Sequence, residues 1–348
     1  MRTSAALIAV ALTLACSGGS PAARAQSPPT TPLNANAVAE MHRVNAADFS
    51  PGADATAPAY DAALLRLQVL LDRAHFSPGS IDGRDGENVR KAVAAYASQH
   101  GVAGDAAVLN SLANADAAPA LAPYTITAAD VRGPFVSIPP SLRAQSRLRR
   151  LGYSSVAEAL GEKFHMDPDL LVALNPGIDF HRANTQILVA APGGGLSSEV
   201  TAIEVDKNVR AVRAFDAQGQ LLAFYPATIG SDENPAPSGD YEVRAVAFDP
   251  VYHFDPARLP AFDRAGGRKF DIRPGPNNPV GLVWIALSLD TYGIHGAPAP
   301  EHIGKTESHG CVRLTNWDAL ELGHAVRPGA RVSFVGSSVE NAAGESAG

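Results

Sequence analysis

Cysteine is scarce in this 348-residue sequence, which contains only Cys16 and Cys311. If the first 25 residues are removed as a signal peptide, Cys311 is the single cysteine of the mature chain, which excludes an internal disulfide in an oxidising compartment. An unpaired cysteine is most often a small buried apolar residue. The glycine and histidines around Cys311, in "SHGCVRL" and "YGIHG", instead favour a reactive thiol.

Long apolar runs are also lacking. The longest, over residues 5–15, is shorter than the roughly 18 to 20 residues that cross a bilayer, so we expect no membrane span. This run precedes Ala23-Arg24-Ala25, a small-x-small sequence typical of signal peptidase sites. We therefore expect a signal peptide at 1–25 and an exported protein of the periplasm or cell envelope. Lipid attachment at Cys16 is a weaker alternative, because Thr13 stands where lipoprotein signals usually have leucine.

Basic charge is low, with 28 Lys and Arg against 35 Asp and Glu. No basic stretch with interleaved aromatic residues occurs, which argues against a nucleic-acid partner. The acidic turn "SPGSIDGRDG" is not a calcium loop of the EF-hand type. Counting from Asp82, its third and fifth positions are Arg84 and Gly86, which offer no side-chain oxygen.

The length predicts two or three domains. Residues 26–58 are rich in Pro, Ala and small polar residues, and we interpret them as a linker with at most one short helix. Residues 59–115 form a predicted helical module, because apolar residues recur there at helical spacing on both sides of the acidic turn. These residues are Leu64, Leu67, Leu70, Leu71, Val89, Val93 and Tyr96.

A second linker is predicted at 116–145, which is again rich in Ala and Pro. Residues 146–192 should hold two amphipathic helices, at roughly 155–164 and 168–174, followed by a loop and a short strand. Ser154 or Ser155 can cap the first helix, and Asp167 before Pro168 begins the second.

From about residue 199 the pattern changes to alternating apolar and polar residues, so 199–336 is predicted to be a mostly β domain. The polar tail 337–348 is predicted to be disordered. The expected fold class is therefore multidomain α+β, with two small N-terminal modules and a C-terminal β-rich domain.

The candidate chemistry lies in "TYGIHGAPAPEHIGKTESHGCVRLTNWDAL". Cys311 should sit on a turn between a loop and a helix capped by Thr315. A neighbouring imidazole would activate the thiol, since the thiolate is the reactive species. Spacing alone does not decide between His295 and His309; we favour His295, which ends a predicted strand. Backbone N–H groups at Gly310 and Cys311 are the natural oxyanion donors.

The C-terminal region resembles the catalytic domain of L,D-transpeptidases, whose signature is His-Gly, a loop, and Ser-His-Gly-Cys-x-Arg. The matching residues are His295, Gly296, Ser308, His309, Gly310, Cys311 and Arg313. Residues 59–115 resemble a helical peptidoglycan-binding domain through "LRLQVLL", "FSPGSIDG" and "VRKAVAAYASQHGV". Residues 146–192 resemble a lysin motif through "LLVALNPGID" and "QILVA".

The resemblance implies an acyl transfer on the glycan-linked stem peptides of peptidoglycan, without cofactor or metal. Cys311 would attack the bond before a terminal D-alanine, and an amine would resolve the thioester. His295 would be the acid and base. Ser308, His309, Gly296 and Gly310 would support the turn or the oxyanion, and Arg313 would hold a substrate carboxylate or pack the loop.

Three alternatives remain open at this point. His295, His302, His309 and Cys311 are potential ligands of a zinc hydrolase, although their spacing is a poor match to zinc sites. A thiol peptidase would use the same nucleophile and base with water as acceptor. A non-catalytic wall-binding protein would depend on the two N-terminal modules alone.

Overall fold

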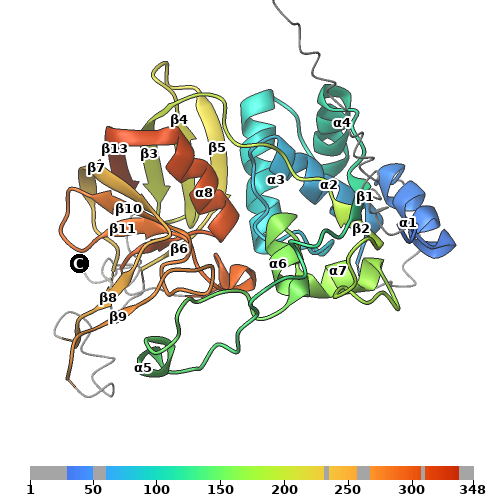
Figure 1. Cartoon of the computed structure of the whole chain (residues 1–348). Coiled ribbons are helices and arrows are strands. Elements are labelled where there is room, and N and C mark those ends of the chain that lie inside the picture. Colours follow the sequence, from blue (N-terminus) through green and yellow to red (C-terminus); the bar gives the residue numbers. More distant parts are fainter. Residues whose placement is uncertain (1–29, 50–59, 231–234, 257–266, 307–309, 337–348) are drawn as a thin grey trace, which may run out of the picture.

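The computed structural model describes residues 30–49, 60–230, 235–256, 267–306 and 310–336 (Figure 1). The predicted signal peptide and C-terminal tail lie outside these residues. The described part contains an N-terminal helical half and a C-terminal half built on a curled sheet, a mixed α+β architecture. Within it, none of the helices has the length and apolar character needed to cross a bilayer.

The first helices are α1 (Ala35–Asn45), α2 (Ala62–Arg73), α3 (Glu87–His100) and α4 (Asp105–Ala115). Asp61 caps α2 by accepting a hydrogen bond from the Leu64 amide at 2.9 Å. Helix α3 ends at Gly101, whose φ of 66° suits a residue without Cβ. The helical periodicity predicted for 59–115 is present in α2 and α3. Helix α1 lies inside the segment predicted as a linker, and it packs on the module through buried Ala37 and Val44.

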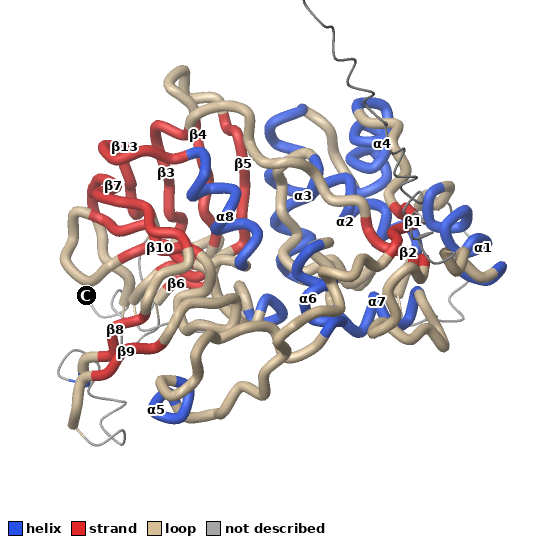
Figure 2. The backbone as a smooth tube through the Cα atoms, in the orientation of Figure 1, coloured by secondary structure: helices blue, strands red, loops and turns tan. Residues whose placement is uncertain are grey.

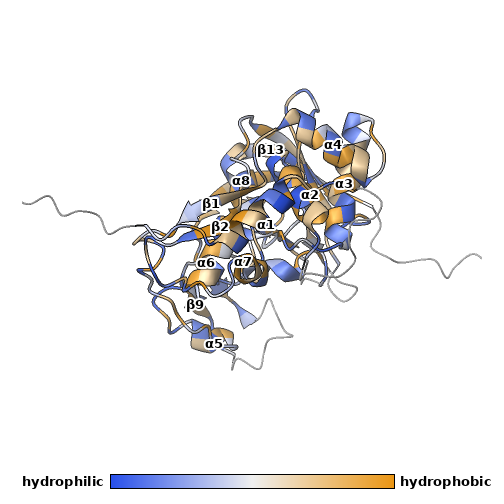
Figure 3. Ribbon diagram, turned by 90° about the vertical axis from the view of Figure 1, so that its right-hand side faces the viewer, coloured by the Kyte–Doolittle hydropathy of each residue, from blue (hydrophilic) through white to orange (hydrophobic). Residues whose placement is uncertain are grey.

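The second unit consists of two paired strands with three helices between them in sequence. Strand β1 (Leu121–Thr125) pairs antiparallel with β2 (Gln186–Ala190), and α5 (Leu142–Gln145), α6 (Val156–Lys163) and α7 (Pro168–Leu174) lie between them in sequence. Ser155 and Asp167 cap α6 and α7 as predicted. Figure 3 shows the apolar β2 in orange between the helices, and four of its five residues are buried.

The segment 116–145 was predicted as a linker, and that prediction is wrong for β1. Its sequence "LAPYT" lacks clear alternation and contains Pro123. Two contacts distant in sequence hold it extended. One is the pairing with β2, and the other is the Asn45 side chain, which donates a hydrogen bond to the carbonyl of Leu121 and accepts one from its amide. Such contacts leave no mark in the strand's own sequence.

The C-terminal sheet has nine strands in the order β5-β4-β3-β13-β7-β10-β11-β12-β6. The strands are β3 (Val200–Asp206), β4 (Ala211–Phe215), β5 (Leu221–Pro226), β6 (Thr228–Ile229), β7 (Gly239–Phe248), β10 (Val283–Leu287), β11 (Gly293–His295), β12 (Val312–Arg313) and β13 (Val326–Val335). Only Ala227 separates the two edge strands β5 and β6 in sequence, so the sheet curls strongly. Helix α8 (Asn316–Ala325) packs on it, and β8 (Tyr252–Phe254) with β9 (Phe270–Ile272) forms a separate hairpin.

The two halves pack against each other, and in one part of their boundary α3 faces the edge strand β5 (Figure 2). The backbone of Phe224 in β5 accepts a hydrogen bond from the Ser77 amide at 2.9 Å and donates one to His75 at 2.8 Å. The buried side chain of Phe224 belongs to the same apolar cluster as Leu67 and Phe76. The helical half therefore completes one edge of the sheet.

Candidate active site

His295 ends the short strand β11 and is only 4% exposed. Its Nδ1 lies 2.7 Å from the carbonyl oxygen of Gly296, and since a carbonyl can only accept, Nδ1 carries the proton. The ring stacks on Trp284, with 5.4 Å between centroids and 23° between planes. The other nitrogen, Nε2, is then an acceptor, as a general base requires.

Cys311 lies directly before β12 and is partly exposed. The parallel pairing of β11 with β12 sets Ile294 beside Val312 and His295 beside Arg313. Cys311 directly precedes this pairing and lies two residues before Arg313, the partner of His295. The structure therefore brings the residue predicted to be the base to the end of β11, and the residue predicted to be the nucleophile to the start of the neighbouring strand β12.

The turn that carries Cys311 depends on its glycine. Gly310 has a φ of 105°, and a Cβ there would lie 3.1 Å from the ring of Tyr292. The thiol contacts the carbonyl oxygen of Thr291 at 3.8 Å. Thr291 has a φ of 71°, which is unusual for a β-branched residue and is typical of backbone held by surrounding structure at functional sites.

Burial keeps both reactive groups uncharged. It lowers the pKa of His295 to about 4, with Arg313 contributing in the same direction and the hydrogen bond to Gly296 opposing it. Burial raises the pKa of the Cys311 thiol, while the Gly293 backbone and Arg313 lower it. At neutral pH the site holds a neutral thiol and a neutral imidazole, so the proton must move during attack.

Arg313 is a cation that acts electrostatically on both His295 and Cys311. Burial lowers its pKa, and the thiol of Cys311 and the phenol of Tyr252 act against that shift. Arg313 makes no ion pair with any residue in the described ranges. A half-buried guanidinium of this kind can receive a carboxylate from a bound molecule.

The other predicted residues divide into two groups. Ser308 and His309 lie outside the described residues. Gly296 is buried directly after His295, and a Cβ there would lie 2.4 Å from Oδ1 of Asn316. Gly296 therefore allows close contact between the strand end and the first residue of α8.

Several residues that support the site were not identified from the sequence. Asn316 contacts Gly296, Tyr292 backs Gly310, and Trp284 stacks on His295. Tyr252, on the β8–β9 hairpin, has a pKa raised mainly by burial, and it lies near enough to Cys311 that the charge of a thiolate there would raise that pKa further. For Asn316, the only feature of the nearby sequence that could have indicated a role in the site was its position next to the capping residue Thr315. The other supporting residues come from segments distant in sequence.

Metal ligands are not grouped in the described part of the chain, where no three His, Cys, Asp or Glu side chains come together in an arrangement that could bind an ion. His302, one of the candidate zinc ligands, is exposed on the short 3-10 turn Pro300–His302. His309 lies outside the described residues.

Comparison with known proteins identifies the family to which the region containing this site is similar. Residues 200–333 match the model of the YkuD family, the L,D-transpeptidase catalytic domain. The YkuD protein of Bacillus licheniformis, which carries an L,D-transpeptidase name, is 28% identical over 178 residues, covering 51% of this chain and 92% of that protein. Its namesake in Bacillus subtilis is 47% identical over 59 residues, covering 17% of this chain and 36% of that protein.

A solved L,D-transpeptidase from Mycobacterium smegmatis aligns with 43% of this chain and 63% of its own, at 20% identity and a TM-score of 0.32. The family match over residues 200–333 shows that the C-terminal region of the chain is an L,D-transpeptidase catalytic domain. The match begins at β3 and leaves the helical half outside it.

Proposed function

We propose that this protein is a cell-wall L,D-transpeptidase with Cys311 as nucleophile and His295 as general base. The observation that supports the proposal best is the parallel pairing of β11, which ends at His295, with β12, which directly follows Cys311, together with the hydrogen bond between Nδ1 of His295 and the Gly296 carbonyl. That bond leaves Nε2 to accept the thiol proton.

In the proposed reaction, the Cys311 thiol gives its proton to Nε2 as sulfur attacks the amide carbonyl between the L-centre of diaminopimelate and D-alanine. The tetrahedral intermediate collapses, the imidazolium returns the proton to the leaving amine, and D-alanine departs. An acceptor amine then attacks the thioester, loses its proton through His295, and restores the thiol.

Charge in this reaction would be handled by groups beside the thiol. The backbone N–H groups of Gly310 and Cys311 are proposed as oxyanion donors, worth about 3 to 4 kcal/mol if well aligned. Arg313, which has no ionic partner among the described residues, is proposed to bind a carboxylate of the stem peptide. Ser308 and His309 are proposed to shape the turn.

The N-terminal half is proposed to bind the wall. Residues 59–115 would act as a peptidoglycan-binding domain, and the unit containing α6, α7, β1 and β2 would act as a lysin motif. Together they would raise the local concentration of stem peptides. The proposal includes export through the signal peptide at 1–25 and action in the periplasm or cell envelope.

The decisive experiment is intact-protein mass spectrometry after incubation with a tetrapeptide stem fragment, comparing the native chain with Cys311→Ala. The proposal expects an adduct with the mass of the stem less D-alanine, absent in the variant. A folded native protein that forms no adduct would favour the wall-binding alternative. Product analysis with and without an added amine then separates transfer from hydrolysis by a thiol peptidase.

A further inference from the structure

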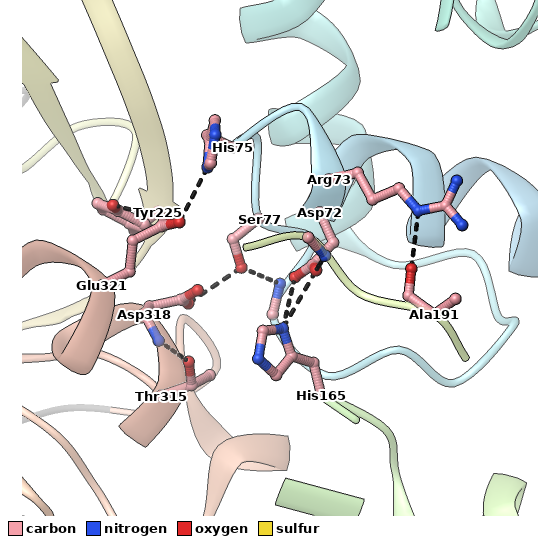
Figure 4. A network of polar contacts seen from close by, with 12 residues as sticks. Asp72, Arg73, His75, Ser77, His165, Ala191, Tyr225, Thr315, Asp318 and Glu321 are labelled. Carbon is pink, nitrogen blue, oxygen red and sulfur yellow. Dashed lines mark hydrogen bonds and ion pairs between the residues drawn. The ribbon is translucent and has the colours of Figure 1, made fainter. Parts of the chain in front are cut away.

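Helix α8 starts five residues after the candidate nucleophile, and residues in its first two turns are held by the helical half. Ser77 donates a hydrogen bond to Asp318 at 3.0 Å, and His75 pairs with Glu321 at 2.8 Å (Figure 4). His165 stacks on Trp317, with centroids 5.2 Å apart and planes 8° apart. The first two turns of α8 therefore belong as much to the interface between the halves as to the catalytic domain.

Asn316, the first residue of α8, is completely buried and has partners on three sides. Its Nδ2 donates to Oε1 of Glu162 at 2.8 Å and to the carbonyl of Pro276 at 3.1 Å. Its Oδ1 accepts from the amide of Leu282 at 3.1 Å. Both protons of the amide group are thus used, and loss of Glu162 would leave one of them buried without an acceptor.

This amide lies against the residue that orients the candidate base. The contact at Gly296 is so close that a Cβ would lie 2.4 Å from Oδ1 of Asn316. The carbonyl of the same Gly296 accepts the Nδ1 proton of His295 at 2.7 Å. Movement of the Asn316 side chain would therefore displace the Gly296 peptide, whose carbonyl sets the tautomer and orientation of the His295 imidazole.

Glu162 itself comes from α6, in the unit that resembles a lysin motif. Helix α6 also contacts the loop before β10, since Asn277 donates to Oε1 of Glu158 at 2.6 Å. Leu151, ahead of α6, exchanges backbone hydrogen bonds with Pro274 and Asn277 in that loop at 2.9 and 3.0 Å. Glu162 is thus fixed against the loop and the helix that meet behind His295.

We infer that Glu162 is a positioning residue for the acyl transfer: by holding the Asn316 amide, it fixes the Gly296 carbonyl and so the orientation of His295. The role in acyl transfer depends on the function proposed above. The relay from Glu162 through Asn316 and Gly296 to His295 does not, because it consists of contacts present in the free protein.

The test compares Glu162→Ala, Glu162→Asp and Glu162→Gln in the full-length chain. Alanine removes the acceptor, aspartate withdraws it by one methylene, and glutamine keeps a carbonyl oxygen at the same reach. Lys163→Ala is the matched control, because Lys163 is the next residue on α6 and bonds to Tyr124 and Asp130 instead.

Two readouts are needed. For transfer from a tetrapeptide stem to an amine, we expect the alanine and aspartate variants to lower kcat on the order of 10- to 100-fold with KM unchanged. The glutamine variant should restore kcat, and the Lys163 control should match the native chain. The second readout is the rate at which iodoacetamide alkylates Cys311, measured as a function of pH. The plot of rate against pH should differ from that of the native chain for Glu162→Ala and Glu162→Asp, and should match it for Glu162→Gln.

Melting curves identify any variant that fails to fold. If Glu162→Ala does not fold, the test rests on Glu162→Asp. Native kcat and a native alkylation profile in a folded aspartate or alanine variant would overturn the inference. If the native chain transfers no stem peptide, the proposed function fails. The alkylation profiles then still decide whether Glu162 positions His295.

Discussion

At the scale of single residues, the uncharged state of Cys311 and His295 determines how the site responds to pH. With the pKa of His295 lowered to about 4 by burial, the imidazole remains a base far below the usual histidine range. With the thiol pKa raised by burial, the proton to be removed stays on sulfur at neutral pH. The pair is suited to a general-base mechanism in which no preformed thiolate is needed.

We therefore predict that kcat/KM for a stem peptide is flat from about pH 5 to 8 and falls on the acid side near pH 4. The measurement is a pH–rate profile in buffers of constant ionic strength. An acid limb near pH 6.5 would contradict the neutral, buried imidazole and would indicate that His295 opens to solvent in the free enzyme.

A second prediction concerns Gly310. Replacement by alanine forces a side chain into a φ of 105° and 3.1 Å from the Tyr292 ring. We expect a loss of roughly 1 to 3 kcal/mol in the free energy of unfolding from the backbone strain, together with reduced acylation of Cys311. Urea unfolding and acylation rates measure the two effects. Gly194→Ala is the control, since a Cβ there meets nothing within 4 Å, and it should change neither.

At the scale of elements, α8 shows what local sequence can and cannot reveal. Its start was predictable because Thr315 caps it, accepting from the Asp318 amide at 3.1 Å. Its packing partners were not, because Ser77, His75 and Glu162 lie far back in the sequence. The same holds for β1, which the pairing with β2 and Asn45 holds extended.

Asp318 gives the third prediction. Burial raises the pKa of its carboxyl to about 8, Asp72 adds to the shift, and Thr315, Ser77 and His165 oppose it. Because the folded-state pKa lies above the ordinary value of 3.8, this carboxyl contributes stability in full below that value and loses it as the pH rises through about 8.

Asp318→Asn cannot ionise and keeps an oxygen for Ser77. Relative to the native chain, we expect its Tm to be similar at pH 4 and higher at pH 9. Asp290→Asn, at an exposed position, is the control and should show no pH-dependent difference. A variant less stable than the native chain at pH 9 would mean that the interface needs the ionised carboxylate.

At the scale of the whole molecule, the two halves form one packed structure. A linear arrangement of separate modules suggests that deleting residues 60–192 would only weaken wall binding. The structure argues otherwise, because deletion would uncover Phe224 on β5 and the buried carboxyl of Asp318. Point substitutions are the better way to separate wall binding from folding.

We predict that the full chain unfolds in a single transition. Both tryptophans of the sequence, Trp284 and Trp317, lie in the catalytic half, so fluorescence follows that half, whereas far-UV circular dichroism near 222 nm follows mainly the helices. The two signals should give the same midpoint. Phe76→Ala, in the shared cluster, should lower the free energy of unfolding obtained from either signal by about 3 to 5 kcal/mol and shift both midpoints together. Separate midpoints would mean that the halves fold independently.

The hydrogen bonds between Phe224 and residues 75–77 also bear on how the chain is made. During synthesis the helical half emerges first and can fold before β5 exists. An unpaired edge strand readily joins the edge of another chain. In this protein, residues 75–77 are already made when β5 forms and can pair with it. A catalytic domain expressed without the helical half would therefore need another segment to pair with β5 if it is to stay monomeric during translation.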